Sequence, residues 1–193
     1  MSGLSADQPL LLAESLGLER GGRELFVNLS FAVHPGQIWQ VEGANGAGKT
    51  SLLRILSGLS RYGYEGSVKR HSHLLYLGHH SAVKATLTPR ENLYWHPAGE
   101  GQYTTGEIDA ALAQVGLYGY EDVPSHSLSA GQQRRVNLAR LYLSTTPLWI
   151  LDEPFTAIDK AGVAMLTARF QQHAQAGGAM LVTSHQPLAV STG

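Results

Sequence analysis

A glycine-rich segment, Gly43-Ala-Asn-Gly-Ala-Gly-Lys-Thr50, constrains this chain more than any other part of its sequence. It follows the short apolar run Ile38–Glu42 and precedes Ser51–Leu59, where apolar residues recur at helical spacing. The pattern G-x-x-x-x-G-K-[ST] between a strand and a helix is typical of a loop whose backbone N–H groups close around a polyphosphate. The sequence therefore predicts a nucleotide site on an α/β fold.

The residues of this loop are expected to have different roles in binding the nucleotide. Glycines let the backbone turn inward, Lys49 is expected to reach the β and γ phosphates, and the Thr50 hydroxyl is expected to bind Mg²⁺. The loop therefore predicts a nucleotide bound with Mg²⁺, and by itself it does not separate kinases, GTPases, helicases and transporter ATPases, whereas ATP as the nucleotide follows from the family resemblance given below. The candidate nucleotide-binding residues here are Gly43, Ala44, Asn45, Gly46, Ala47, Gly48, Lys49, Thr50 and Ser51.

The order of strands and helices predicts the fold class. Short apolar strands alternate with helices, and Gly21-Gly22 joins the first two predicted strands. Capping patterns at Thr88–Glu91 and Thr104–Glu107 predict helices in the middle of the chain, the second ending at Gly116. We expect an α/β P-loop NTPase fold with a mainly parallel core sheet, an antiparallel hairpin region at the N-terminus and a helical insert.

The 193 residues are expected to form a single domain, with its core at about 1–85 and 145–193 and a helical subdomain at about 86–144. The predicted strands are Leu10–Leu18, Leu25–Val33, Ile38–Glu42, Leu74–Leu77, Leu148–Leu151 and Ala179–Ser184. Besides the two capped helices, the predicted helices are Ser51–Leu59, Ser129–Leu143 and Lys160–Ala176, the last with Asp159 as a plausible cap.

Two acids end a buried strand, in the sequence Leu148-Trp-Ile-Leu-Asp-Glu153. Because side chains alternate along a strand, the two carboxylates are expected to do different jobs. Asp152 suits the Mg²⁺ shell, and Glu153 suits deprotonating the water that attacks the γ phosphate. The alternative, a solvated acidic pair, fits poorly behind four apolar residues.

The segment Leu128-Ser-Ala-Gly-Gln132 opens a helix with Ser129 at its N-cap, which makes a second anion site. This segment resembles the signature motif of ABC ATPases, and the same chain also has the loop at Gly43–Thr50 and the acids at Asp152-Glu153. By that resemblance two chains sandwich two ATP molecules, and the partner's ATP is bound by Ser129, Gly131 and Gln132.

The resemblance implies roles for two further residues. Asp159 lies in the loop that joins the two ATP sites, and His185 resembles the switch histidine that contacts the γ phosphate. The catalytic residues it implies are thus Glu153, His185 and Lys49.

Three segments, Ser129–Val136, Leu148–Asp159 and His185–Leu188, closely resemble the ATP-binding subunit of the haem exporter of bacterial cytochrome c maturation, the CcmA-type group. This implies an ATPase on the cytoplasmic face of the inner membrane that acts through membrane-embedded permease subunits. Its ATP turnover would be coupled to haem delivery or to release of a haem-loaded chaperone. An ABC transporter for another substrate, a soluble ABC ATPase and a P-loop kinase or GTPase are the alternatives.

The chain departs from the family pattern at two places. His80 stands where a glutamine usually begins the helical insert, and it is placed with Thr50 and Asp152 among the candidate metal ligands. An imidazole accepts one hydrogen bond, but unlike an amide it titrates near neutrality. The aromatic residue that usually stacks on adenine is absent, and Arg20 is the best local substitute because a guanidinium can stack on a ring.

Composition excludes several other classes of function. The chain has no cysteine, which excludes a disulfide framework and a thiolate metal site. Its net charge of −1 argues against bulk nucleic-acid binding. No run of 18 or more apolar residues and no secretory signal are present, so we expect a cytosolic chain that contacts the membrane only through partners. His71, His73, His79 and His80 could suggest haem or metal binding, but a His-x-His on a loop is more often solvated, and His79-His80 already has a place beside the ATP site.

Overall fold

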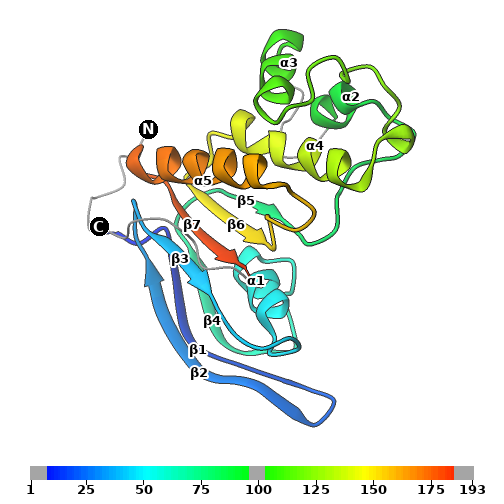
Figure 1. Cartoon of the computed structure of the whole chain (residues 1–193). Coiled ribbons are helices and arrows are strands. Elements are labelled where there is room, and N and C mark those ends of the chain that lie inside the picture. The colour runs from blue at the N-terminus through cyan, green and yellow to red at the C-terminus, as the bar shows by residue number, and fades with distance from the viewer. Residues whose placement is uncertain (1–7, 96–102, 185–193) are drawn as a thin grey trace. The chain divides into compact units, whose positions relative to one another are not determined.

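The computed structural model describes residues 8–95 and 103–184. The chain forms two compact units (Figure 1). The first unit consists of Met1–Tyr76, Thr146–Glu153 and Gln171–Gly193. The second consists of Leu77–Thr145 and Pro154–Phe170.

An antiparallel sheet in strand order β2-β1-β4 begins the first unit. Strands β1 (Leu11–Arg20) and β2 (Arg23–Val33) form the predicted hairpin around Gly21-Gly22. The sequence analysis missed β4 (Glu65–Arg70), which pairs antiparallel with β1. Val68 is the only large apolar residue of β4, so the strand has no hydrophobic pattern and depends on the edge that β1 offers.

The second sheet has the strand order β3-β7-β6-β5 and confirms the predicted α/β class. Strands β3 (Ile38–Val41) and β6 (Leu148–Asp152) both run parallel to β7 (Ala179–Thr183). Every residue of β6 and β7 is buried, as expected for parallel strands covered on both faces. Strand β5 spans Leu74–Leu77, as predicted.

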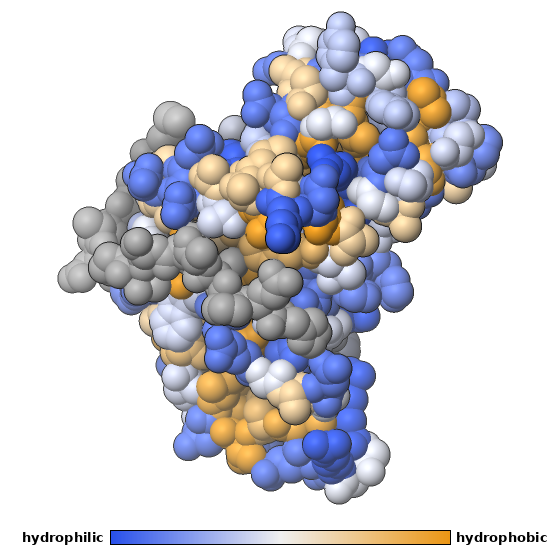
Figure 2. All heavy atoms as spheres, viewed as in Figure 1, coloured by the Kyte–Doolittle hydropathy of each residue, from blue (hydrophilic) through white to orange (hydrophobic). Residues whose placement is uncertain are grey.

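Helix α1 (Lys49–Ser57) packs against β6 and β7. It starts two residues before the predicted Ser51, because the loop leads directly into the first helical turn. Its buried leucines and isoleucine join Leu148, Ile150 and Leu181 in one hydrophobic core. Figure 2 shows apolar side chains also gathered on a face of the β1–β2 region, where Val27 stays 55% exposed.

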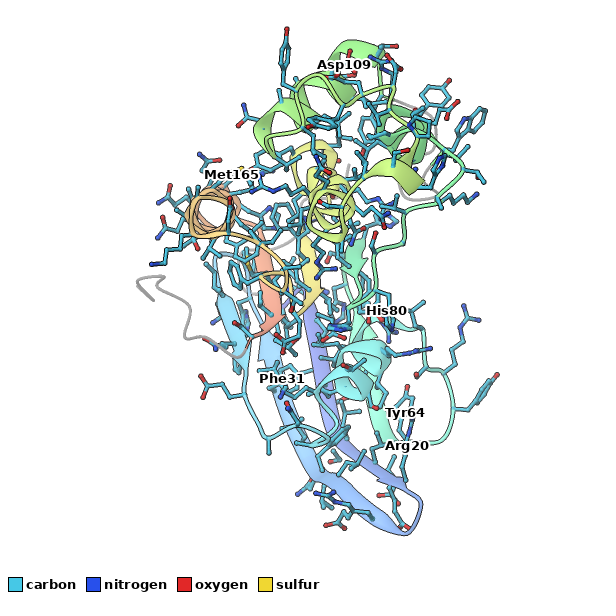
Figure 3. All side chains as sticks on the ribbon, turned by 45° about the vertical axis from the view of Figure 1, so that its right-hand side comes forward. Arg20, Phe31, Tyr64, His80, Asp109 and Met165 are labelled. Carbon is cyan, nitrogen blue, oxygen red and sulfur yellow. The ribbon has the colours of Figure 1, made fainter. Side chains whose placement is uncertain are left out.

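Three short helices that pack on one another dominate the second unit: α2 (Pro89–Tyr94), α3 (Thr105–Gln114) and α4 (Ala130–Leu143). Thr88 and Thr104 cap α2 and α3 through the predicted capping boxes. Arg90 of α2 donates to Asp109 of α3 at 2.9 Å (Figure 3). A 3₁₀ turn at Ser125–Ser127 precedes α4 and was not predicted.

Helix α5 (Lys160–Gln175) begins in the second unit and ends in the first. It follows the prediction to within one residue and is capped by Asp159, whose Oδ1 accepts the Gly162 N–H at 2.9 Å. Within residues 8–95 and 103–184, no helix is long and apolar enough to span a bilayer.

Candidate functional site

The glycine-rich loop joins the end of β3 to the start of α1, as predicted. The Lys49 ammonium donates to the Gly43 carbonyl oxygen at 2.5 Å and also reaches the Ala44 carbonyl at 3.4 Å. The first hydrogen bond of the helix runs from Leu52 N to Gly48 O at 2.8 Å. The lysine and the N-terminus of α1 therefore place positive charge at one loop.

Gly48 cannot be replaced by a larger residue without strain. Its φ of +94° lies in the left-handed region, and a Cβ there would lie 3.1 Å from Cβ of Leu25. Leu25 of β2 therefore lies against the loop, which the sequence analysis did not foresee. The sequence correctly indicated that this position needs a glycine, but it did not show that Leu25 of β2 packs there.

The two acids lie at the end of β6, where the chain leaves the parallel sheet. Asp152 is 1% exposed, and its Oδ1 accepts the Thr183 hydroxyl at 2.8 Å. The backbone N–H of Glu153 donates to the same hydroxyl oxygen, also at 2.8 Å. Glu153 has a φ of +50°, uncommon for a residue with a side chain. One threonine on β7 thus contacts both acidic residues, and the sequence analysis did not identify it.

The residues of the first unit fit a magnesium nucleotide. The Thr50 hydroxyl and the Asp152 carboxylate supply oxygen donors, which Mg²⁺ prefers. In the described part of the chain, no group of three or more histidine, aspartate or glutamate side chains could hold a metal ion alone. Mg²⁺ in nucleotide sites usually takes its other ligands from phosphate oxygens and water. Burial and the nearby Asp152 charge both raise the pKa of Tyr76 in this unit.

Helix α4 carries the signature segment in the second unit. The Ser129 hydroxyl accepts the Gln132 N–H at 3.2 Å, and the Gln132 side chain accepts the Ser129 N–H at 2.9 Å. This reciprocal pair confirms Ser129 as the predicted N-cap. A Cβ on Gly131 would lie 3.1 Å from the Ala157 carbonyl, so the helix start approaches the loop before α5 closely.

Asp159 is held by the same helix. Its Oδ1 accepts from Arg135 at 2.6 Å, in addition to the cap bond to α5. Arg135 also donates to the Val115 carbonyl at 2.8 Å, at the end of α3. The sequence analysis missed Arg135, which ties the Asp159 loop to two helices.

His80 follows β5 and belongs to the second unit, whereas Thr50 and Asp152 belong to the first. The buried Arg134 of α4 holds the backbone just before it, donating to Gly78 O at 2.9 Å and to His79 O at 3.3 Å. The role of His80 at the metal stays a prediction. The sequence analysis did not identify Arg134. A charged residue among the apolar residues of a predicted helix would have been a signal that its side chain binds a buried polar group.

Arg20 ends β1 at the hairpin and is exposed (Figure 3). A cavity of about 340 Å³ near the same end of the sheet is lined by Leu18, Phe26 and Tyr64 but also by Glu19, Glu24 and Glu65. Three carboxylates repel a polyphosphate, so this cavity does not suit the phosphates of a nucleotide, and their binding at Gly43–Thr50 stays a prediction. His185 lies outside the described residues, and its switch role stays a prediction.

Comparison with known proteins gives consistent results. Residues 26–156 match the ABC transporter family. The chain is 54% identical to the cytochrome c biogenesis ATP-binding export protein CcmA of Yersinia pestis bv. Antiqua (strain Nepal516), over 93% of this chain and 87% of that protein. The protein of the same name from Hahella chejuensis (strain KCTC 2396) is 49% identical, over 97% and 94%. A solved structure described as the ATP binding subunit of an ABC transporter has a TM-score of 0.79 at 21% identity, over 91% of this chain and 79% of that one.

Proposed function

This chain belongs to the ABC transporter family, in the group of the cytochrome c biogenesis ATP-binding export proteins CcmA, and we propose that it is the ATP-hydrolysing subunit of a complex that matures c-type cytochromes. In that role it couples ATP binding and hydrolysis to haem delivery, or to release of a haem-loaded chaperone, through membrane subunits. The observation that carries the pathway is the 54% identity over 93% of the chain to a protein of that name.

The ATPase chemistry needs a phosphate cradle and a base. The Gly43–Thr50 loop binds the phosphates, with Lys49 neutralising the β and γ groups and Thr50 and Asp152 holding the metal. Bound Mg²⁺ neutralises charge that develops on the phosphate oxygens. Glu153 accepts the proton of the attacking water, and His185 contacts the γ phosphate. The Thr183 hydroxyl binds the Asp152 carboxylate and the Glu153 backbone, which supports placing both acidic residues at one site.

The second unit serves the ATP of a partner chain. ABC ATP-binding subunits dimerise, and in the proposed dimer Ser129, Gly131 and Gln132 at the N-terminus of α4 face the partner's γ phosphate. The bonds from Arg135 to Asp159 and to the end of α3 support a role for the Asp159 loop in reporting the state of that site. His80 is proposed, with Thr50 and Asp152, as a ligand of the metal.

The base of the nucleotide lies beside the hairpin. Arg20 stacks its guanidinium on the adenine, and Leu25 supplies apolar contact next to Gly48. The 3.1 Å approach of Leu25 to the Cβ position of Gly48 supports this placement of the base. Because Arg20 is exposed, its charged group stays in water, and placing it on the base requires little desolvation.

Family members work with membrane permease subunits. We place this chain on the cytoplasmic face of the bacterial inner membrane, attached through such subunits of a cytochrome c maturation complex. The helical segment at about 86–144 is the part that transmits nucleotide state to them. No nucleic acid takes part.

The test is affinity isolation of the tagged Glu153→Gln chain from membranes of its own cells with ATP present. The same chain carrying Lys49→Ala, which is not expected to hold ATP, is the matched control. Recovery of membrane subunits and haem-handling proteins, with a haem absorbance spectrum, is the expected result. A permease without haem proteins would overturn the pathway and keep the transporter. Ribosomal or DNA-repair proteins without a membrane protein would overturn both.

A further inference from the structure

Thr183 is a polar residue where the strand around it is apolar. It ends β7, is fully buried, and follows Ala179, Met180, Leu181 and Val182. A buried hydroxyl is costly unless it is hydrogen-bonded, and valine has nearly the same shape and equal preference for strands. Strand formation and packing therefore do not explain a threonine at this position.

The Thr183 hydroxyl both donates and accepts a hydrogen bond. It donates a hydrogen bond to Asp152 Oδ1 at 2.8 Å and accepts one from the Glu153 N–H at 2.8 Å. The parallel register, in which Asp152 and Thr183 are paired, brings the three groups together. A hydroxyl has one donor and two acceptor lone pairs, so one side chain can satisfy both bonds.

These bonds act on the two acidic residues in different ways. The first restricts rotation of the Asp152 carboxylate, because one of its oxygens is bound to a fixed strand. The second secures the Glu153 backbone at its φ of +50°, the unfavourable turn in which the chain leaves β6. The direction in which the Glu153 side chain departs depends on that turn.

We infer that Thr183 is a positioning residue for ATP hydrolysis, whose single hydroxyl sets the orientation of both the metal-binding Asp152 and the base Glu153. The inference rests on the proposed function. It assigns no contact with the nucleotide to Thr183, which acts only through its two neighbours. ATP affinity comes mainly from the Gly43–Thr50 loop, so losing the hydroxyl should affect turnover more than binding.

The experiment compares Thr183→Val, which keeps the shape, with Thr183→Ser, which keeps the hydroxyl, in the full chain with its membrane partner. For Thr183→Val we expect kcat to fall about 10- to 100-fold, the range typical when the partner of a metal-binding side chain is removed. The KM for ATP should change less than kcat, because most of the affinity for ATP comes from the Gly43–Thr50 loop. Thr183→Ser should recover most of the activity.

Two further measurements separate positioning from folding. Thr167→Val makes the same chemical change at a hydroxyl that bonds only the Val163 carbonyl within α5, at 2.8 Å, and should leave turnover unchanged. The increase in melting temperature that Mg²⁺ adds to that of ATP alone should shrink in Thr183→Val and return in Thr183→Ser. A purely structural role would lower the melting temperature without changing this magnesium-dependent increment or kcat per folded molecule.

The outcomes distinguish this inference from the proposed function. A wild-type chain that neither hydrolyses ATP nor gains stability from Mg²⁺ and ATP would overturn the function, and the inference with it. An active wild type together with an equally active Thr183→Val variant of unchanged magnesium response would overturn the inference alone.

Discussion

Ser129 has two separable jobs in the proposed mechanism, and substitution can distinguish them. Its hydroxyl caps α4 by accepting the Gln132 N–H, and it is also expected to donate to the γ phosphate of a partner chain. Aspartate caps helices as well as serine does, but it brings a negative charge to the phosphate. Ser129→Asp should therefore keep the fold and lose the dimer.

The magnitudes follow from the two kinds of contact. Ser129→Ala removes the cap and should cost about 1 kcal/mol of unfolding free energy. Ser129→Asp should stay within about 0.5 kcal/mol of the parent, because a carboxylate also interacts well with a helix N-terminus. A hydrogen bond to a charged group is worth about 1.5–3 kcal/mol, and a closed dimer contains two of them. Their loss corresponds to at least about a 100-fold weaker ATP-dependent association.

The assay uses Glu153→Gln as the parent, since slow hydrolysis lets ATP-bound dimers accumulate. Sedimentation velocity with and without ATP measures the dimer, and urea unfolding measures stability. Thr104→Ala is the matched control, because Thr104 has the same capping box on α3 and no proposed nucleotide contact. It should lose about as much stability as Ser129→Ala and none of the dimer.

The reasoning fails if Ser129→Asp dimerises with ATP as well as the Glu153→Gln parent does. It fails equally if Thr104→Ala loses the dimer, because helix stability alone would then account for the effect. A parent that stays monomeric at saturating ATP would refute the sandwich dimer itself.

Four other changes test separate parts of the structure. Arg20→Ala should weaken ATP binding about two- to fivefold in a fluorescent-nucleotide titration, the loss expected for an exposed stacked guanidinium. Arg23→Ala, at the residue that pairs with Arg20 on β2 and has no proposed contact with the base, should not weaken it. Arg134→Met should cost about 1–3 kcal/mol in urea unfolding by leaving two backbone carbonyls without their charged donor, and an unchanged midpoint would contradict it. The raised pKa of Tyr76 means that the folded chain holds this proton more tightly, so stability should fall as pH rises above about 10, and Tyr76→Phe should flatten that fall in unfolding curves. His80→Gln introduces the side chain that usually stands at this position, which can also accept a hydrogen bond, so an ATPase assay should show retained activity, and a loss of activity would refute an equivalent role for the two side chains.

Local chemistry determined much of what could be predicted. The helix starts after Thr88, Thr104 and Ser129 were all correct, because a capping box depends on residues three apart in the sequence. The phosphate loop and strand β6 were likewise evident, since glycine spacing and an unbroken apolar run are local signals. The family resemblance built on those segments is confirmed by the match to residues 26–156.

The tertiary structure decided the rest, for two physical reasons. Strand β4 has no hydrophobic pattern and exists because β1 provides an edge with unpaired backbone groups to bond. Thr183, Arg134 and Arg135 act through partners separated by 31, 56 and 24 residues along the chain. Such bonds leave no periodic trace in the sequence, because the register of the sheet and the packing of α4 create the meeting points. The motifs named the chemical groups of the site, and only the folded backbone determined which side chains orient them.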